Sequence, residues 1–434
     1  MKRKKALGLV ELIAIAVGGM VGGGIFTILG ISVSMVGFLA PFAIAIGGVI
    51  AFFAAYSYVK LGVYYKDDGA TYAFFKRTYP SSNLAASFIG WYTIFGYIST
   101  LSLYAYTFAS YGISGTSFSH DEMARKVVAI SIIWVFALIN IWSVKGMGKI
   151  EDIMVYFKLF ILFLISFALI YYSKVDIQEF SNMLIRDLKN SSGLNILIVS
   201  SITFVAYEGF QLVINAVNDM ENPDKNIPRA IYSAIFIVVF IYFVISLGSV
   251  LAIPAEDLIK NKEYALAAGA KDILGTLGEN MVILGAVLAT SSAISGTMFG
   301  SSRQMADIAR DGYLPAFLSK RDNTIPKKAI VAMALTASFL IFVGGLKLIL
   351  EFGSITFLLV SLLMAVANFK IRKKTDSHTL FSLIAILGLV VGACLILYYE
   401  YKTKPEQLLF IVGLYVILTI GAYIYAKIGE KRWS

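Results

Sequence analysis

Glu208 lies in the middle of a long apolar stretch, in the run Phe204-Val205-Ala206-Tyr207-Glu208-Gly209-Phe210. Burying a carboxylate among apolar side chains costs free energy, so a residue of this kind commonly serves a function. Its ionised form would pair with a cationic ligand, and its acid form would carry a proton. The alternative is a glutamate that is held neutral, or paired, for structural reasons alone.

A glycine-rich run lies in an earlier apolar stretch and reads Gly18-Gly19-Met20-Val21-Gly22-Gly23-Gly24. It has five glycines in seven positions, and each glycine costs a helix up to about 1 kcal/mol relative to alanine. An unwound segment would expose backbone N–H groups, and those at the start of the next half-helix bind an anion such as a carboxylate. The alternative is a seam of close helix packing, since Gly18 and Gly22 have the spacing of small residues in such seams.

Lys158 lies in a third apolar stretch, within Val155–Leu162. At a rise of about 1.5 Å per residue, it lies roughly 7–8 Å inside this stretch if the stretch begins at Ile153. Burial removes water from the ammonium group, and such a lysine can release and take up a proton near neutral pH. Two alternatives are a side chain that snorkels to the polar end of the stretch and a pair with Glu151 or Asp152.

The composition places these residues in a membrane protein. Of the 434 residues, 58% are hydrophobic and 15% are charged, and the mean hydropathy is +0.78, whereas soluble domains carry about 25% charged residues. A helix of about 17–25 apolar residues crosses the hydrocarbon core of a bilayer. Twelve such ranges are predicted, at about 8–30, 39–59, 85–111, 127–143, 153–172, 194–217, 230–252, 281–301, 329–345, 352–369, 380–399 and 408–426.

Several other classes of protein do not fit the sequence. Two histidines and one cysteine provide no metal-binding motif and no intrachain disulfide, so no metal or other cofactor is expected. The net charge of +10 is spread over short loops, so no nucleic acid partner is expected. The larger share of the lysines and arginines falls on the side of the two termini. The positive-inside rule therefore predicts cytoplasmic termini for a multi-pass protein of the plasma membrane.

The two interrupted stretches, around Gly22 and Glu208, lie in the first and the sixth of the predicted ranges. A pair of broken helices of this kind is typical of transporters whose substrate binds near the bilayer midplane, between two structural repeats. We therefore expect the two breaks to meet at one site.

The same residues resemble those of amino acid permeases in the amino acid–polyamine–organocation superfamily. Gly22–Phe26 looks like the family signature G-[SAG]-G-I-F, and Phe204–Phe210 is similar to the sixth span of its members. The resemblance continues in order through Glu221-Asn222-Pro223, Ile227-Pro228-Arg229-Ala230-Ile231, Ser291-Ser292, Ser302-Arg303, Ala309-Arg310-Asp311-Gly312 and Leu314-Pro315. One departure is Asn218-Asp219, where many members carry an acidic residue at the first position.

The resemblance implies an all-α integral membrane fold of twelve transmembrane helices in one domain, residues 1–434. Two inverted five-helix repeats would cover about 8–172 and 194–369. Helices 1 and 6, which open the two repeats, would be broken, and two peripheral helices would lie at about 380–426.

The resemblance also implies how an amino acid would bind. Backbone N–H groups near Gly23 and Gly24 would hold the carboxylate, and the carbonyls of Met20, Val205 and Glu208 would hold the ammonium. This arrangement is chemically sound, because a zwitterion without water needs donors at one end and acceptors at the other. The implied substrate-binding residues are Met20, Gly22, Gly23, Gly24, Val205, Tyr207 and Glu208.

Lys158 has a counterpart in some members of the superfamily, in which a fifth-span lysine places its ammonium where relatives bind sodium. In sodium-coupled relatives the ion is held by carbonyls of the first span and hydroxyls of the eighth. The matching groups, expected to act in proton coupling with Lys158, are the carbonyls of Gly18 and Val21 and the hydroxyls of Ser291 and Ser292.

Together these features predict a secondary active transporter, not an enzyme, that carries amino acids with protons by alternating access. Two alternatives of the same class are a sodium-coupled symporter and an exchanger of amino acids or amines. A channel or a membrane enzyme is a more distant alternative, since the sequence has no polar-lined pore and no catalytic cluster.

Overall fold

The structure is a computed structural model that describes residues 7–142, 147–173, 175–322 and 324–433, with the backbone alone at 147–154, 177 and 430–433. Within these ranges the chain is helical, and two isolated β-bridges, Leu7–Met220 and Asp322–Ile325, are its only β-type pairs. The elements are α1 Leu9–Met20, α2 Gly24–Val36, η1 Gly37–Leu39, α3 Ala40–Tyr65, α4 Ala70–Thr78, α5 Asn83–Gly112, α6 Glu122–Trp142, α7 Met147–Tyr171, α8 Ile177–Asn190, α9 Gly193–Ile202, η2 Thr203–Tyr207, α10 Leu212–Asn215, α11 Pro223–Ala252, α12 Ala255–Lys260, α13 Ala265–Arg310, η3 Ala316–Ser319, α14 Lys327–Val343, α15 Leu346–Lys370, α16 Thr379–Thr403 and α17 Pro405–Trp433.

The helices follow the predicted apolar ranges. The first range contains α1 and about the first half of α2, and the sixth contains most of α9, η2 and α10. Each of the others coincides with most of one helix or with part of a longer one. Among the described residues, nine stretches of helix are long and apolar enough to cross a membrane. The prediction of an all-α membrane protein is therefore confirmed, while the number of twelve crossings stays a prediction.

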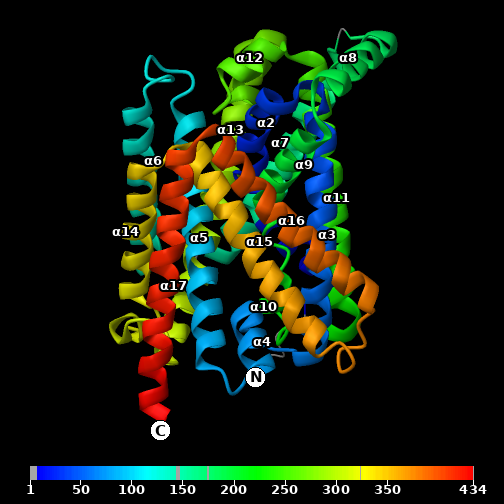
Figure 1. Ribbon diagram of the computed structural model, residues 1–434. Coiled ribbons are helices and arrows are strands. Elements are labelled where there is room, and N and C mark those ends of the chain that lie inside the picture. The colour runs from blue at the N-terminus through cyan, green and yellow to red at the C-terminus, as the bar shows by residue number, and fades with distance from the viewer. Residues whose placement is uncertain (1–6, 143–146, 174, 323, 434) are drawn as a thin grey trace.

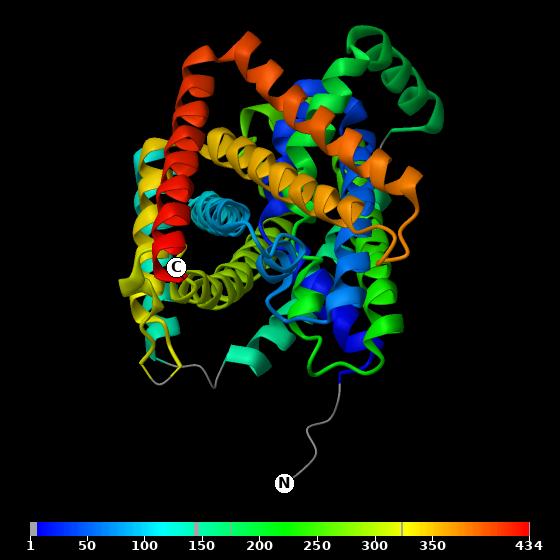
Figure 2. The same cartoon turned by 60° about the horizontal axis from the view of Figure 1, so that its bottom comes forward.

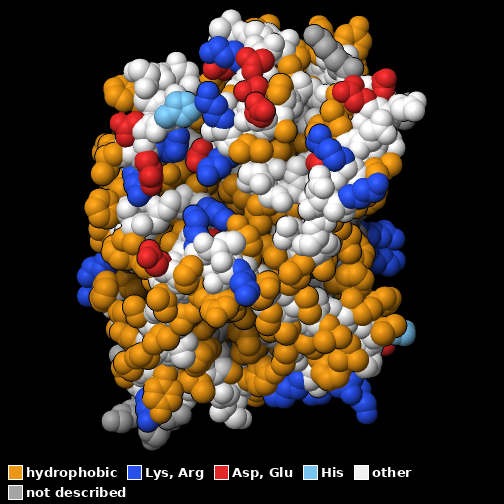
Figure 3. All heavy atoms as spheres, turned by 45° about the horizontal axis from the view of Figure 1, so that its top comes forward, with side chains coloured by type: hydrophobic (Ala, Val, Ile, Leu, Met, Phe, Trp, Pro, Cys, Tyr) orange, Lys and Arg blue, Asp and Glu red, His pale blue; other side chains and the backbone are white. Residues whose placement is uncertain are grey.

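The sides of the molecule are apolar and its two ends are charged (Figure 3). Large aromatic side chains point outward from several of the long helices, as lipid contact requires. Examples that are more than half exposed are Phe163, Phe167, Phe236, Phe240, Phe339 and Phe342.

The helices form one bundle whose two ends differ (Figure 1). One end, here called the terminal face, carries α4, α10 and the C-terminal end of α17, and the other, the opposite face, carries α8 and α12. Viewed from the terminal side, α5 runs through the bundle with α13, α15 and α17 around it (Figure 2). Because α5 is enclosed in this way, its polar side chains meet protein rather than lipid.

Candidate functional site

The glycine run interrupts the first span. α1 ends at Met20 and α2 begins at Gly24, and the residues between them are not helical. The first backbone hydrogen bond of α2 runs from the N–H of Thr27 to the carbonyl of Gly23 at 3.2 Å, and no side chain caps the helix. The N–H groups of the first turn therefore have no partner within the helix and remain for another acceptor.

The second break follows η2 in the sixth span. Glu208 leaves the helical conformation, and Gly209 has a φ of +127°, which residues with a side chain rarely adopt. A Cβ atom at Gly209 would also lie 2.5 Å from the carbonyl carbon of Gly19. Glycine is therefore required here both by the backbone conformation and by the close approach of the first span.

The two breaks are in direct contact, as expected from the sequence. Besides the approach of Gly209 to Gly19, a Cβ atom at Gly24 would lie 2.7 Å from that of Ala206. The hydroxyl of Tyr242 in α11 lies within hydrogen-bond distance of two carbonyls, that of Met20 at 2.8 Å and that of Ala206 at 3.2 Å, and it shares its one hydrogen between them. Tyr242 thus contacts both broken segments, and no local feature of the sequence predicted this contact.

The carboxyl group of Glu208 is buried, with 4% of the residue exposed. Its Oε2 accepts a hydrogen bond of 3.0 Å from Nε2 of Gln211, while Oε1 meets no hydrogen-bond donor in the part of the chain that is described. Tyr58, Tyr97 and Tyr104 lie close enough to interact with its charge. One carboxyl oxygen is therefore available to a proton or to a cationic ligand.

The start of α2 is covered by α5 and α13. A Cβ atom at Gly22 would lie 2.9 Å from that of Ala293, and one at Gly23 would lie 3.1 Å from both a ring carbon of Tyr104 and the methyl group of Thr290. No local feature of the sequence marks these three side chains as neighbours of the break. Which residues of α5 and α13 face the break depends on how the helices pack, and a single sequence does not show it.

The remaining predicted binding groups already have partners within the protein. The carbonyl of Met20 also accepts from the N–H of Gly22 at 2.9 Å, and that of Val205 accepts from the N–H of Glu208 at 3.2 Å. The hydroxyl of Tyr207 donates to the carbonyl of Ile44 in α3 at 2.7 Å. The side chain of Tyr207 is therefore directed at α3, and its backbone is the part that faces the break.

Lys158 is fully buried, and its ammonium donates to the carbonyl of Gly18 at 2.8 Å. The neighbouring turn of α7 supports this contact, because Val155 packs so closely that a Cβ atom at Gly18 would lie 2.9 Å from its methyl group. α7 also packs against α13, where a Cβ atom at Gly285 would lie 2.7 Å from Ile161. Lys158 therefore sits between the first span and the helix that carries Ser291 and Ser292.

The alternative in which Lys158 snorkels to the end of its span is wrong, because its amine points to Gly18 and is not exposed. The side chains of Glu151 and Asp152 lie outside the described residues, so a pair with either of them stays open. Of the other predicted coupling residues, Val21 and Ser292 are buried and Ser291 is partly buried.

A sequence model described as "Amino acid permease" matches residues 7–399 of the chain. The chain belongs to this family. Its resemblance to the amino acid–polyamine–organocation superfamily is thereby confirmed, and it is a multi-pass membrane transporter.

Several relatives align over most of the permease. An uncharacterized protein of Methanocaldococcus jannaschii is 28% identical over 100% of this chain and 98% of its own length. The inner membrane transport protein YbaT of Escherichia coli is 28% identical over 98% of this chain and 97% of its own length. The large neutral amino acids transporter small subunit 2 of Rattus norvegicus is 27% identical over 97% of this chain and 80% of its own length.

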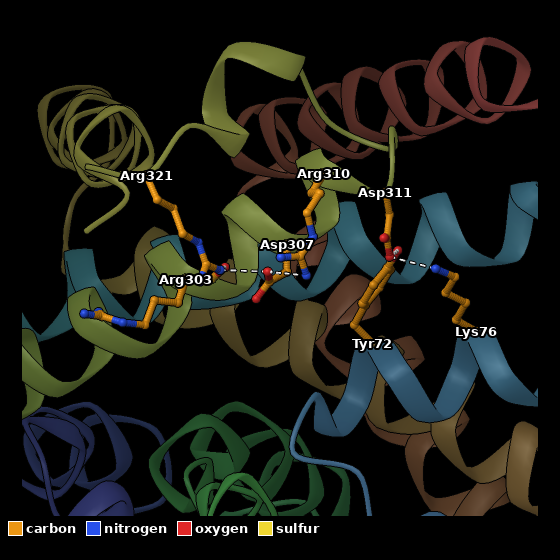
Figure 4. A network of polar contacts seen from close by, with 7 residues as sticks. All are labelled: Tyr72, Lys76, Arg303, Asp307, Arg310, Asp311 and Arg321. Atoms are coloured by element: carbon orange, nitrogen blue, oxygen red, sulfur yellow. Dashed lines mark hydrogen bonds and ion pairs between the residues drawn. The ribbon is translucent and has the colours of Figure 1, made fainter. Parts of the chain in front are cut away.

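The segment at the end of α13, which includes Asp307, Arg310 and Asp311, forms an ion-pair network on the terminal face of the permease (Figure 4). Asp311 accepts from the hydroxyl of Tyr72 at 2.8 Å and pairs with the ammonium of Lys76 at 2.7 Å, both in α4. Burial, followed by the charge of Asp311, raises the pKa of Tyr72. The phenol therefore stays protonated and keeps donating at neutral pH.

One turn earlier on α13, Asp307 pairs with Arg310 at 2.8 Å and with Arg321, from the segment after η3, at 2.7 Å. Arg303 places its guanidinium over the ring of Phe299, 3.4 Å from the ring centroid. The network thus joins α4, the end of α13 and the segment that follows η3 across the terminal face (Figure 4).

Proposed function

We propose that this permease is a proton-coupled amino acid symporter in which Lys158 carries the coupling proton. The observation that supports it most directly is the buried ammonium of Lys158, which donates to the carbonyl of Gly18 next to the first break. This carbonyl matches one of those that hold sodium in sodium-coupled relatives. A charged lysine supplies a positive charge at that place without sodium, and release of its proton removes the charge.

The substrate is an amino acid bound at the two breaks. N–H groups of Gly23 and Gly24 hold its carboxylate, because the start of α2 has unpaired donors and the positive end of a helix dipole. The carbonyls of Met20, Val205 and Glu208 hold its ammonium. The carbonyl of Val205 keeps a second lone pair beyond its bond to the N–H of Glu208, whereas the carbonyl of Met20 has to give up one of its two donors, Tyr242 or the N–H of Gly22. The contact between the two broken spans places these donors and acceptors within one small region.

The same proposal gives the architecture of the permease. Twelve spans form two inverted repeats, at about 8–172 and 194–369, and peripheral helices follow at about 380–426. The breaks support this division, since one lies in the first helix of each repeat. The terminal face is cytoplasmic in the plasma membrane, because the larger share of the basic residues lies on that side.

Transport proceeds by alternating access. Met20, Val205 and Glu208 are buried, so a substrate reaches them only after one side of the protein opens. On the terminal face, the ion-pair network joins the elements that would have to separate. On the opposite face, a cavity of about 960 Å³ extends inward from the charged surface (Figure 3).

Uptake of labelled amino acids into proteoliposomes tests the proposal when proton and sodium gradients are imposed separately. We expect an inward proton gradient to drive accumulation, and a sodium gradient at constant pH to have no effect. Accumulation driven by sodium alone would favour the sodium-coupled symporter. Uptake that occurs only when the liposomes contain an amino acid or amine would favour the exchanger.

Glu208→Gln is expected to change the preference for cationic over neutral substrates, or the pH dependence of transport, by more than tenfold. A tenfold change corresponds to about 1.4 kcal/mol, and the physical reason is the free Oε1 atom beside the proposed ammonium site. Uptake and competition assays from about one unit below to one unit above neutral pH measure it. Glu279→Gln is the control, because Glu279 is also buried but pairs with Lys271 at 3.1 Å. An unchanged profile in Glu208→Gln would leave Glu208 a structural residue.

A further inference from the structure

Two buried carboxyl groups lie toward the opposite face, away from the breaks. Glu351 is in the second turn of α15 and Glu400 is in the last turn of α16, and both residues are completely buried. α15 and α16 pack side by side (Figure 1), and the two carboxyl groups lie close enough for their charges to interact. Neither residue has a role in the transport mechanism proposed above.

Few donors face this pair. Lys347 lies 3.6 Å from Oε1 of Glu351, and Nε2 of Gln407 donates to Oε2 of Glu351 at 3.3 Å. The ammonium of Lys347 also donates to the hydroxyl of Tyr399 at 2.6 Å. Neither oxygen of Glu400 meets a hydrogen-bond donor among the described side chains.

The charged and titratable groups around the pair come from two helices and from the turn that follows the second of them. They are Lys347 and Glu351 from α15, Tyr399 and Glu400 from α16, and Lys404 from the turn before α17. From α5, the element on the other side of α15, the hydroxyl of Ser99 donates to the backbone carbonyl of Ile349. In the described part of the chain, the cation that makes an ion pair with Glu351 is Lys347, and Lys404 lies farther off.

The burial of both carboxyl groups and the lack of donors around Glu400 favour a state in which the pair holds one proton. An ionised carboxylate only accepts hydrogen bonds, so two carboxylates in contact repel each other, whereas an acid and a carboxylate form a hydrogen bond. If Glu351 holds one proton, its O–H donates to Glu400, and the remaining negative charge of the pair is balanced by Lys347. If both were ionised, Glu400 would be a buried charge without a donor, which is strongly unfavourable.

We propose that Glu351 and Glu400 form a proton-binding site on the opposite face, separate from Lys158. The proton reaches it from water in the cavity described above, whose lining includes Lys347, Tyr399, Lys404 and Gln407. The bound proton holds α15 against α16. The site does not depend on the proposed coupling mechanism, because it rests on its own contacts.

Infrared difference spectroscopy of the purified permease in detergent tests this site. At neutral pH, the wild type minus Glu400→Gln spectrum should contain the C=O band of a protonated carboxylic acid, which shifts in deuterium oxide. Glu400→Gln is the conservative variant, because it keeps the shape of the side chain and its amide N–H can donate to the carboxylate of Glu351. Glu279→Gln, at the ion-paired carboxylate, should give no such band. If neither Glu400→Gln nor Glu351→Gln removes an acid band, the proposal is overturned.

Thermal unfolding at a series of pH values gives a second readout. In the unfolded chain, glutamates release their protons near a pH of about 4.3, while the folded pair keeps one. The contribution of this pair to the free energy of unfolding is therefore at its full value below that pH. It falls as the pH rises, until the folded pair also loses its proton. Glu400→Gln should flatten this fall, and Glu279→Gln should keep it. Parallel profiles for the wild type and Glu400→Gln would overturn the proposal.

Discussion

Lys158→Ala is expected to abolish amino acid uptake driven by a proton gradient, while binding of the amino acid in detergent stays measurable. The ammonium of Lys158 is buried against the carbonyl of Gly18, and alanine removes both the charge and the group that exchanges the proton. A gradient drives the cycle only if the two protonation states favour different conformations. Without the lysine, no group at this place takes up or releases a proton, so the proton gradient can no longer drive the cycle.

The charged state of Lys158 would tie the first span to the helix of Ser291 and Ser292, and the neutral state would let them separate. Lys158→Met, which keeps much of the volume but never carries charge, should behave like Lys158→Ala. Lys66→Ala is the control, because Lys66 is exposed on the terminal face and pairs with Asp224. Proton-driven uptake by Lys158→Ala, or sodium-dependent uptake by the wild type, would refute the mechanism.

Gly23→Leu is expected to abolish amino acid binding while the permease still folds. A Cβ atom at Gly23 would already lie 3.1 Å from Tyr104 and Thr290 and 3.2 Å from Thr107, and the rest of the leucine would fill the space in front of the N–H groups of α2. Ligand-induced thermal stabilisation measures binding, and size-exclusion chromatography checks folding. Gly24 is less suitable, because a Cβ atom there would lie 2.9 Å from the backbone of Ala206.

Two comparisons make this test specific. Gly388→Leu in α16 is the matched control, because a side chain at Gly388 would meet open space within 4 Å. Amino acid amides and decarboxylated amines should bind the wild type on the order of 10–100-fold more weakly for each lost bond, since a hydrogen bond to a charged group contributes about 1.5–3 kcal/mol. Normal binding by Gly23→Leu, or an amine that competes as well as its amino acid, would place the carboxylate elsewhere.

The sequence was sufficient to predict the two breaks and their contact. Five glycines within Gly18–Gly24 and a glycine beside Glu208 are poor helix formers in otherwise apolar spans, and both positions are non-helical in the structure. The contact of Lys158 with Gly18 was also expected, although from family resemblance rather than from the residues alone. In each case the sequence contains a residue type that is unfavourable where it lies, either a helix-breaking glycine or a charged side chain within an apolar span.

The parts that the sequence did not reveal depend on packing between distant helices. Tyr104 and Tyr242 are two tyrosines among 25 in the chain, and nothing local distinguishes those that reach the breaks. Glu351 and Glu400 each lie near the end of an apolar span, where a charged residue is ordinary. Only their packing side by side in the bundle makes them unusual.

The ion pairs of the terminal face have a consequence for how this end responds to ionic strength. Lys76, Arg310 and Arg321 are all partly exposed, and exposed ion pairs are worth about 0–1 kcal/mol each. Several weak bonds of this kind break one after another, so thermal motion can separate them without one large barrier. Dissolved salt screens charges beyond about 8 Å at physiological concentration. In the proposed alternating-access cycle, the closed terminal end should therefore lose stability as the salt concentration rises, and it should open more often.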